Sequence, residues 1–325
     1  MKRLIGIALL IGVGVALALV ARFGLSAVIQ ALAALGWTGF ALVVLFHLGL
    51  FILMGASWWL LGRQRPEAEL RNFVWGRLIR DSASEALPFS QLGGYVLGAR
   101  ALTLSGVSAR FAVASTVVDI SLELIAQCLY ALLGVALLFR LEPRNHLVIP
   151  ILAGLLAMSV LAGGFLVIQA HGFGVLERVG AALGARWLAG RTQLVQKLER
   201  EIRAIHDHRL MLGLCLLGHF FCWLGNGVEA WLTLRWMNVH IGISAALVID
   251  SLLYGMRSLV FFLPGAIGLQ EGGYVMLGAL FGISPPAALA LSFIRRGRDL
   301  AIGVPALLAW QLLEGWRAVR GVTQR

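Results

Sequence analysis

Residues 263–279 read LPGAIGLQEGGYVMLGA, and this stretch decides the fold. It lies inside a long apolar region, yet it carries a proline, five glycines, Gln270 and Glu271. Within hydrocarbon, broken backbone is tolerated only where protein or a water-filled cavity shields it. A carboxylate at that depth is costly to bury and is a functional-site hypothesis by default. The stretch therefore predicts a broken, re-entrant helical element inside a membrane protein.

A second stretch resembles the first. Residues 87–99 read LPFSQLGGYVLGA and share the LP, GGYV and GA segments in the same order. The similarity continues, because residues 104–108 (LSGVS) resemble residues 280–284 (LFGIS). Each copy precedes a span that bears an acid, Asp119 or Asp299. We expect an internal repeat, and transporters built this way place their site near the membrane midplane, at the repeat interface.

The composition excludes a soluble globular protein. Of the 325 residues, 59% are hydrophobic and 13% are charged, and the mean hydropathy is +0.87. These values predict an all-α polytopic membrane protein. The net charge of +11 comes mainly from basic residues between apolar runs, as in cytoplasmic loops that face anionic lipid headgroups. No basic domain or binding motif points to nucleic acid.

We expect one integral membrane domain over residues 1–325, with about six full transmembrane helices and two re-entrant hairpins. The expected spans are residues 4–21, 36–61, 107–139, 147–169, 210–234 and 287–313. The positive-inside rule places both termini in the cytoplasm. This orientation requires that hairpin 77–104 opens to the inside and hairpin 244–282 to the outside, which makes residues 36–169 and 210–313 an inverted repeat.

Two segments, the N-terminal residues and the linker between the repeats, leave alternatives. Residues 4–21 are expected to form an uncleaved first helix, although Ala16-Leu17-Ala18 resembles the cleavage site of a signal peptide. Residues 171–209 form the polar linker between the repeats. Leu194, Leu198, Ile202 and Ile205 recur there at helical spacing, which predicts an amphipathic helix on the cytoplasmic surface. An ordinary basic loop explains the same composition.

Charged residues at membrane depth form the candidate transport site. Arginine binds phosphate bidentately and stays charged, so the sequence predicts a polar cavity for a lipid headgroup, in which acids pair with arginines or take up protons. The candidates are Arg80, Glu85, Asp119, Arg257, Glu271, Arg298 and Asp299. We expect Glu271 to face Arg257 or the opposite repeat. Structural ion pairs such as Arg295–Asp299 or Asp250–Arg257 are the alternative.

Proline and glycine mark the breaks in the two hairpins. Pro88 is expected to set the first turn, because it cannot continue a helical hydrogen-bond ladder. Gly93, Gly94, Gly272 and Gly273 allow close approach of backbone or ligand, and helix packing through small residues explains them equally well. Half-helix N-termini at such breaks offer unpaired amides to an anion.

No motif indicates catalysis or a bound metal. The chain has no GxSxG, HExxH or P-loop motif. Cys128, Cys215 and Cys222 lie in apolar runs without a CxxC pair, so buried thiols are expected. We expect no catalytic residue, metal or cofactor. Without an ATPase module, transport would be passive or driven by an ion gradient.

The segment SEALPFSQLGGYVLGARAL with the downstream Asp119, and the segment LPGAIGLQEGGYVMLGALFGIS with the downstream Arg298-Asp299, resemble a known family. It is the lysylphosphatidylglycerol synthase transmembrane family, the flippase-like part of bacterial multiple-peptide-resistance proteins. The resemblance covers essentially the whole chain. Its first glycine-proline motif corresponds to Pro88, Gly93 and Gly94, and its second to Pro264, Gly265, Gly268 and Glu271. The first 25 residues and the chain length are similar to the hopanoid-biosynthesis-associated HpnL branch.

The resemblance implies a lipid flippase or transporter of the bacterial inner membrane that handles hopanoid or an anionic phospholipid. The full synthases continue into a soluble aminoacyl-transfer domain, whereas this chain stops at Arg325, so we do not expect an enzyme. Expected partners are a membrane lipid and anionic headgroups, with a second copy of the chain or lipid-biosynthesis enzymes as protein partners. The alternatives are a non-transporting scaffold of a lipid-biosynthesis complex and a lipid-modifying enzyme that uses Glu271 or Asp299 as general base.

Overall fold

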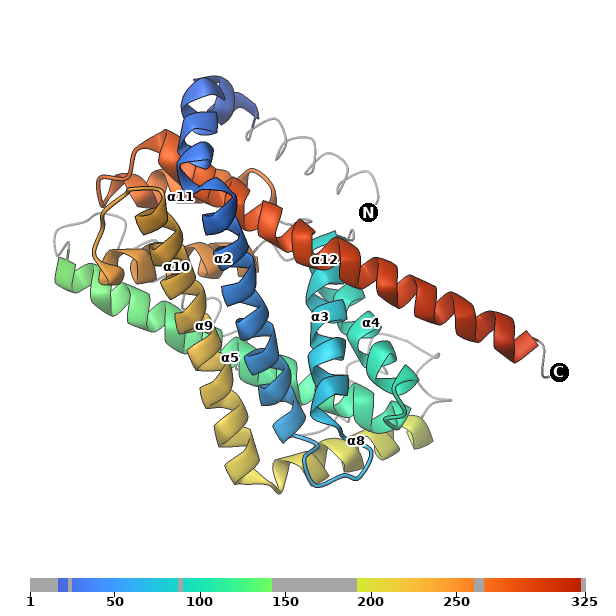
Figure 1. Ribbon diagram of the computed structural model, residues 1–325. Helices are drawn as coiled ribbons and strands as arrows, with labels where there is room; N and C mark the ends of the chain where they lie inside the picture. The colour runs from blue at the N-terminus through green and yellow to red at the C-terminus, as the bar shows by residue number, and fades with distance from the viewer. Residues whose placement is uncertain (1–16, 23–24, 87–89, 142–191, 260–265, 323–325) are drawn as a thin grey trace, which may run out of the picture.

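The computed structural model describes residues 17–22, 25–86, 90–141, 192–259 and 266–322, and this part of the chain is helical, with no strand (Figure 1). The expected all-helical fold is therefore confirmed. The helices are α2 (Leu25–Leu60), α3 (Leu70–Ala86), α4 (Ser90–Leu104), α5 (Ala109–Leu141), α8 (Thr192–His206), α9 (Arg209–Trp236), α10 (Ile243–Leu259), α11 (Leu269–Ala279) and α12 (Pro285–Val322).

Three helices of the described chain are long and apolar enough to cross a membrane. They are Val28–Leu60 within α2, Ala109–Leu141 (α5) and Arg209–Trp236 (α9), at the positions of three expected spans. Helix α2 begins earlier than expected, and Gly36 breaks it with φ of 63° and ψ of 175°, a conformation open to glycine. The expected span 147–169 and most of the span 4–21 lie outside the described residues.

Two further helices carry charges that set them apart from simple apolar spans. Helix α10 has 17 residues and contains the buried Asp250. Helix α12 continues for 38 residues, beyond the expected span 287–313, and it runs away from the bundle toward the C-terminus (Figure 1). Arg295 and Arg298 are buried on it. Burial of these charges predicts partners on neighbouring helices.

Two pairs of packed helices occupy the regions in which hairpins are expected. Helix α3 packs along α4, and α10 packs against α11. The residues between them, 87–89 and 260–265, lie outside the described part, and so do Pro88, Pro264 and Gly265. Helices α3 and α10 thus end before Pro88 and Pro264, and the prediction that Pro88 sets the first turn lies outside the described residues.

The contacts between helices fall into matched pairs. We call α2–α5 the N-terminal half and α9–α12 the C-terminal half. Helix α2 packs on α9, where the two halves meet. Four contacts that involve the N-terminal half have counterparts in the C-terminal half. The contact α2–α3 corresponds to α9–α10, and α4–α5 corresponds to α11–α12. Likewise, α5–α9 corresponds to α12–α2, and α5–α10 corresponds to α12–α3. Each half therefore contributes the same kinds of contact to the bundle.

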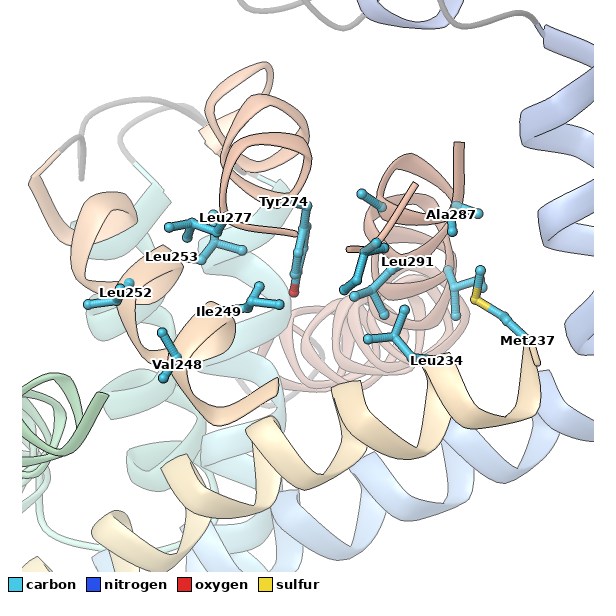
Figure 2. Close-up of a cluster of buried hydrophobic side chains, with 14 of the residues drawn as sticks. Leu234, Met237, Val248, Ile249, Leu252, Leu253, Tyr274, Leu277, Ala287 and Leu291 are labelled. Atoms are coloured by element: carbon cyan, nitrogen blue, oxygen red, sulfur yellow. The ribbon is translucent and has the colours of Figure 1, made fainter. Parts of the chain in front are cut away.

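Apolar side chains fill the space between these helices in two main clusters. In the first, α9 contributes Leu234 and α10 contributes Ile249 and Leu253, which pack with Tyr274 of α11 and Leu291 of α12 (Figure 2). The second cluster joins α2, α3 and α5 through Trp58, Phe73 and Phe111. Helix α8 lies across one end of the bundle (Figure 1). Its Ile202 and Ile205 enter the second cluster, so this amphipathic helix packs its isoleucines on the protein.

Candidate functional site

A cavity of about 400 Å³ lies between the two halves, a size within the range of small-molecule sites. Both halves supply charged side chains to its wall. These are Arg77, Arg80, Asp81, Glu85 and Glu123 from the N-terminal half, and Arg257, Arg298 and Asp299 from the C-terminal half. Tyr95, Trp223 and Tyr254 add aromatic surface. Five of the predicted site residues therefore share one cavity: Arg80, Glu85, Arg257, Arg298 and Asp299.

The first group of charges, which we call the Arg80 cluster, consists of Arg77, Arg80, Asp81, Asp119, Glu123 and His219. The Arg80 guanidinium donates to Asp119 at 2.5 Å and also to Glu123. Arg77 donates to both oxygens of Glu123, at 2.9 and 2.5 Å, and to Asp81 at 2.7 Å. Asp119 and Glu123 lie one helical turn apart on α5, which is why the arginines of α3 reach both.

Asp119 does not line the cavity itself; it lies behind Arg80, fully buried. Its second oxygen is 2.8 Å from Nε2 of His219, which α9 contributes from the C-terminal half. The predicted residue Asp119 therefore belongs to the site through its partners.

The second group, the Arg298 cluster, consists of His47, Glu229, Asp250, Arg295, Arg298 and Asp299. Arg298 pairs with Glu229, and it donates to Asp299 at 2.6 and 3.0 Å. Arg295 pairs with Asp250. The other oxygen of Glu229 is 2.8 Å from Nδ1 of His47. All of these residues come from the C-terminal half except His47, which lies on α2.

Direct polar contacts across the cavity join the two halves. Arg257 of α10 donates to Glu85 of α3 at 2.7 Å, and to Gln270 at 2.8 Å. Gln127 of α5 donates to the Ser258 hydroxyl at 2.6 Å and to the Tyr254 carbonyl oxygen at 3.1 Å. The Glu85 side chain is one-third exposed, so this ion pair is the most open of the cavity pairs described.

Glu271 occupies a different place from the one predicted. It contacts neither Arg257 nor the opposite half among the described residues. Its carboxylate accepts a hydrogen bond from the Gly268 amide at 2.7 Å and pairs with Arg296 at 2.6 Å. This is a capping arrangement at the start of α11, in which the third helical residue satisfies an otherwise unpaired amide. We therefore assign Glu271 to helix capping and correct the prediction that it faces Arg257.

The structure gives the glycines of the two motifs different roles. A Cβ atom on Gly94 would lie 2.0 Å from the Ser84 hydroxyl oxygen and 2.3 Å from the Arg80 carbonyl oxygen, so Gly94 lets α4 approach α3. Gly268 has φ of 83°, which favours glycine. Gly272 has open space at the Cβ position, and Gly93 lies on α4, half-buried.

The site also contains residues outside the candidate set taken from the sequence. His47, His219 and Glu229 form hydrogen bonds between helices. Asp250 pairs with Arg295, and not with Arg257 as in the alternative of structural ion pairs. A signal was present in the sequence, because the pattern R-x-x-R-D occurs twice, as Arg77–Asp81 on α3 and as Arg295–Asp299 on α12. The pattern places two arginines on one helix face and supplies the guanidinium groups of each cluster.

One group of described residues has the donor atoms for a metal ion. The ligating atoms of Asp119, Cys215 and His219 all lie within 4.8 Å of one another. However, Arg80 and Arg77 approach Asp119 to 2.5 and 3.6 Å, and their positive charges oppose a cation there. We assign these residues to charge pairing.

The cavity can bind the polar groups of a molecule, although the outer surface of the helical bundle is apolar. Ser82 and Ser84 line the cavity, and among the described residues their buried hydroxyl oxygens have no hydrogen-bond partner. Buried polar groups are normally paired, so these hydroxyls are available to a bound molecule.

Comparison with curated proteins and with solved structures gave no match. The family model described as the lysylphosphatidylglycerol synthase TM region matches residues 4–306, which is most of the chain and includes both clusters. With its long apolar helices, the protein is thus a membrane protein of a lipid-related family. The chain belongs to the lysylphosphatidylglycerol synthase transmembrane family.

Proposed function

We propose that this protein is a flippase-like transporter that moves a lipid between the leaflets of the bacterial inner membrane. The observation that carries this proposal is the cavity whose charged wall comes from both halves of the helical bundle. A polar headgroup crossing hydrocarbon needs such a shielded route, because a charged group is expensive at membrane depth. The acyl chains or ring system would stay in the surrounding lipid.

The proposed substrate is an anionic phospholipid or a hopanoid. Arg257 would hold an anionic headgroup, since its partner Glu85 is partly exposed and a phosphate could replace that carboxylate bidentately. The hopanoid alternative rests on the similarity of the first 25 residues to the HpnL branch. Mass spectrometry of lipids that purify with the full chain distinguishes the two.

We further propose an inverted repeat with both termini in the cytoplasm. The matched contacts of α2–α5 and α9–α12 support a repeat, and so do the two GGYV segments at Gly93–Val96 and Gly272–Val275. Opposite orientations of the two halves would place the headgroup site at their interface, as in other transporters with inverted repeats.

Transport is favoured over catalysis and over a scaffold role. Each carboxylate in the cavity wall pairs with an arginine, which disfavours a free general base of the kind that lipid chemistry needs. A scaffold would not need a cavity lined by charges. We propose no enzymatic activity, no cofactor and no nucleic-acid partner.

The proposal is tested by lipid translocation in proteoliposomes that contain the purified full chain. Arg257→Gln should slow translocation of an anionic phospholipid about tenfold or more, because a hydrogen bond to a charged group contributes about 1.5–3 kcal/mol. Arg100→Gln is the matched control, since Arg100 is half-exposed and pairs with Glu314 away from the cavity. Equal rates for both variants and the unchanged chain would contradict the role of the cavity.

A further inference from the structure

The charges around the cavity are not balanced. The Arg80 cluster contains three carboxylates, of Asp81, Asp119 and Glu123, but only the two guanidinium groups of Arg77 and Arg80. The pairs Arg257–Glu85 and Arg296–Glu271 are each balanced. An uncompensated charge in a buried site is strongly unfavourable.

The Arg298 cluster repeats this imbalance. It contains the carboxylates of Glu229, Asp250 and Asp299 and the guanidinium groups of Arg295 and Arg298. Among the described residues, each cluster therefore carries one negative charge in excess when every carboxylate is ionised and both histidines are neutral.

Each cluster also contains one histidine, placed directly on one of the carboxylates. Nε2 of His219 is 2.8 Å from Asp119, and Nδ1 of His47 is 2.8 Å from Glu229. The exposed fractions of these two residues are 1% and 7%. One proton on each imidazole would bring each cluster to neutrality, and histidine is the side chain that ordinarily changes charge between about pH 5 and 8.

The charged groups around the two imidazoles are arranged as this count of charges requires. His219 faces Asp119 of α5, with Cys215 beside it on α9, and the Arg80 and Arg77 guanidinium groups lie beyond Asp119. His47 faces Glu229 of α9, which in turn pairs with Arg298 and Arg295 of α12. In both cases a carboxylate separates the imidazole from the arginines.

We propose that each cluster binds one exchangeable proton, held by the His47–Glu229 pair and by the His219–Asp119 pair. A hydronium ion in the cavity would transfer its proton to the imidazole of His47, forming an N–H bond and leaving a water molecule. The reverse step releases the proton. His47 lines the cavity directly, whereas His219 lies behind Arg80 and Asp119.

The proton sites lie where the two halves meet. Each histidine comes from the first helix of one half, and its carboxylate partner comes from the other half. Loss of either proton leaves an excess negative charge between the halves and weakens their contact. Building on the proposed transport function, we assign these protons as the coupling ions for lipid movement.

A charge-compensation cycle tests the proton sites without measuring transport. His47→Gln should lower the melting temperature of the purified full chain, because the Arg298 cluster keeps its excess carboxylate. The double variant His47→Gln with Asp299→Asn should recover most of that loss, because it removes the excess charge as well. His219→Gln with Asp81→Asn is the equivalent pair in the other cluster. His206→Gln is the control, since His206 lies on α8, outside the cavity wall.

The pH dependence gives a second readout of the same cycle. The melting temperature of the unchanged chain should fall as the pH rises, because an imidazolium that stabilises the fold by facing a carboxylate is lost at higher pH. The fall should be smaller in each double variant. If His47→Gln matches the unchanged chain at every pH, or if Asp299→Asn adds to its loss instead of reversing it, the proton assignment is wrong. Stabilisation by sodium ions in place of acid would also overturn it.

Coupling is tested in proteoliposomes with labelled phosphatidylglycerol and an imposed pH gradient. The gradient should change the translocation rate of the unchanged chain, and it should have a smaller effect on the His47→Gln, Asp299→Asn double variant, which keeps only the proton of the His219–Asp119 pair. A translocation rate that does not depend on the pH gradient would refute proton coupling and leave the proposed transport function intact. The variants could show the expected melting temperatures while the protein translocates neither phospholipid nor hopanoid. In that case the proton sites stand and the proposed transport function is wrong.

Discussion

Arginine is the residue that makes the interior of this protein polar. Arg80 is 2% exposed and lies between Asp119 and Glu123, with the rings of Tyr95 and Trp58 at 4.9 and 5.7 Å from its guanidinium carbon. A guanidinium group can satisfy two carboxylates and an aromatic face simultaneously, which an ammonium group does less well. Its burial therefore depends on having all these partners.

Removal of this one side chain should be far more damaging than removal of an exposed arginine. Arg80→Gln leaves the buried Asp119 and the partly buried Glu123 with one guanidinium fewer, so we expect a loss of about 3–5 kcal/mol in unfolding free energy. Arg100→Gln should lose less than about 1 kcal/mol, as exposed ion pairs do. Chemical unfolding of both variants in detergent measures the difference, and similar losses would show that the cluster contributes little to folding.

Glycines decide how closely the helices approach each other. Besides Gly94 between α4 and α3, a Cβ atom on Gly218 of α9 would lie 2.1 Å from the Ser57 hydroxyl of α2. A Cβ atom on Gly134 of α5 would lie 1.8 Å from the Ser251 hydroxyl of α10. Small residues allow this approach in membrane proteins, where packing replaces the hydrophobic effect between helices.

Substitution of Gly94 tests this packing at the level of the helix pair. Gly94→Ala should destabilise the protein by about 1–3 kcal/mol, the range for overpacking, because the added methyl group meets the backbone of α3. Gly49→Ala is the control, since no atom lies within 4 Å of its Cβ position and alanine favours a helix. Thermal unfolding compares them, and a stable Gly94→Ala variant would contradict the close approach of α3 and α4.

Helix breaks were predictable from the sequence, whereas most charge partners were not. The LP segments at residues 87–88 and 263–264 fall between the described helices, because proline acts locally, whereas the GGYV segments lie inside α4 and α11. His47 and Glu229 are 182 residues apart, and their contact depends on α2 packing against α9. The mixed charge of residues 63–80 is typical of a surface segment, yet Arg77 and Arg80 are buried. The four-residue spacing of Asp119 and Glu123 indicates a shared helix face, as the R-x-x-R-D pattern does for the arginines.

The whole molecule has the polarity of a membrane protein. Large apolar side chains such as Leu45, Ile52 and Phe221 are more than half exposed, whereas Asp119, Glu229 and Asp250 are buried. In a soluble protein the reverse arrangement is normal. Hydrocarbon around the bundle accounts for the apolar outside, and ion pairs with buried arginines account for the charged inside.

The proposed route through the cavity is tested most directly by blocking it. Ser258→Cys places a thiol on the cavity wall in a chain whose own three cysteines are buried. A bulky, reversible thiol reagent should then stop lipid translocation in proteoliposomes, and a reductant should restore it. The unchanged chain and the exposed variant His240→Cys, treated identically, should continue to translocate lipid. Full translocation with the cavity thiol completely modified would contradict the account.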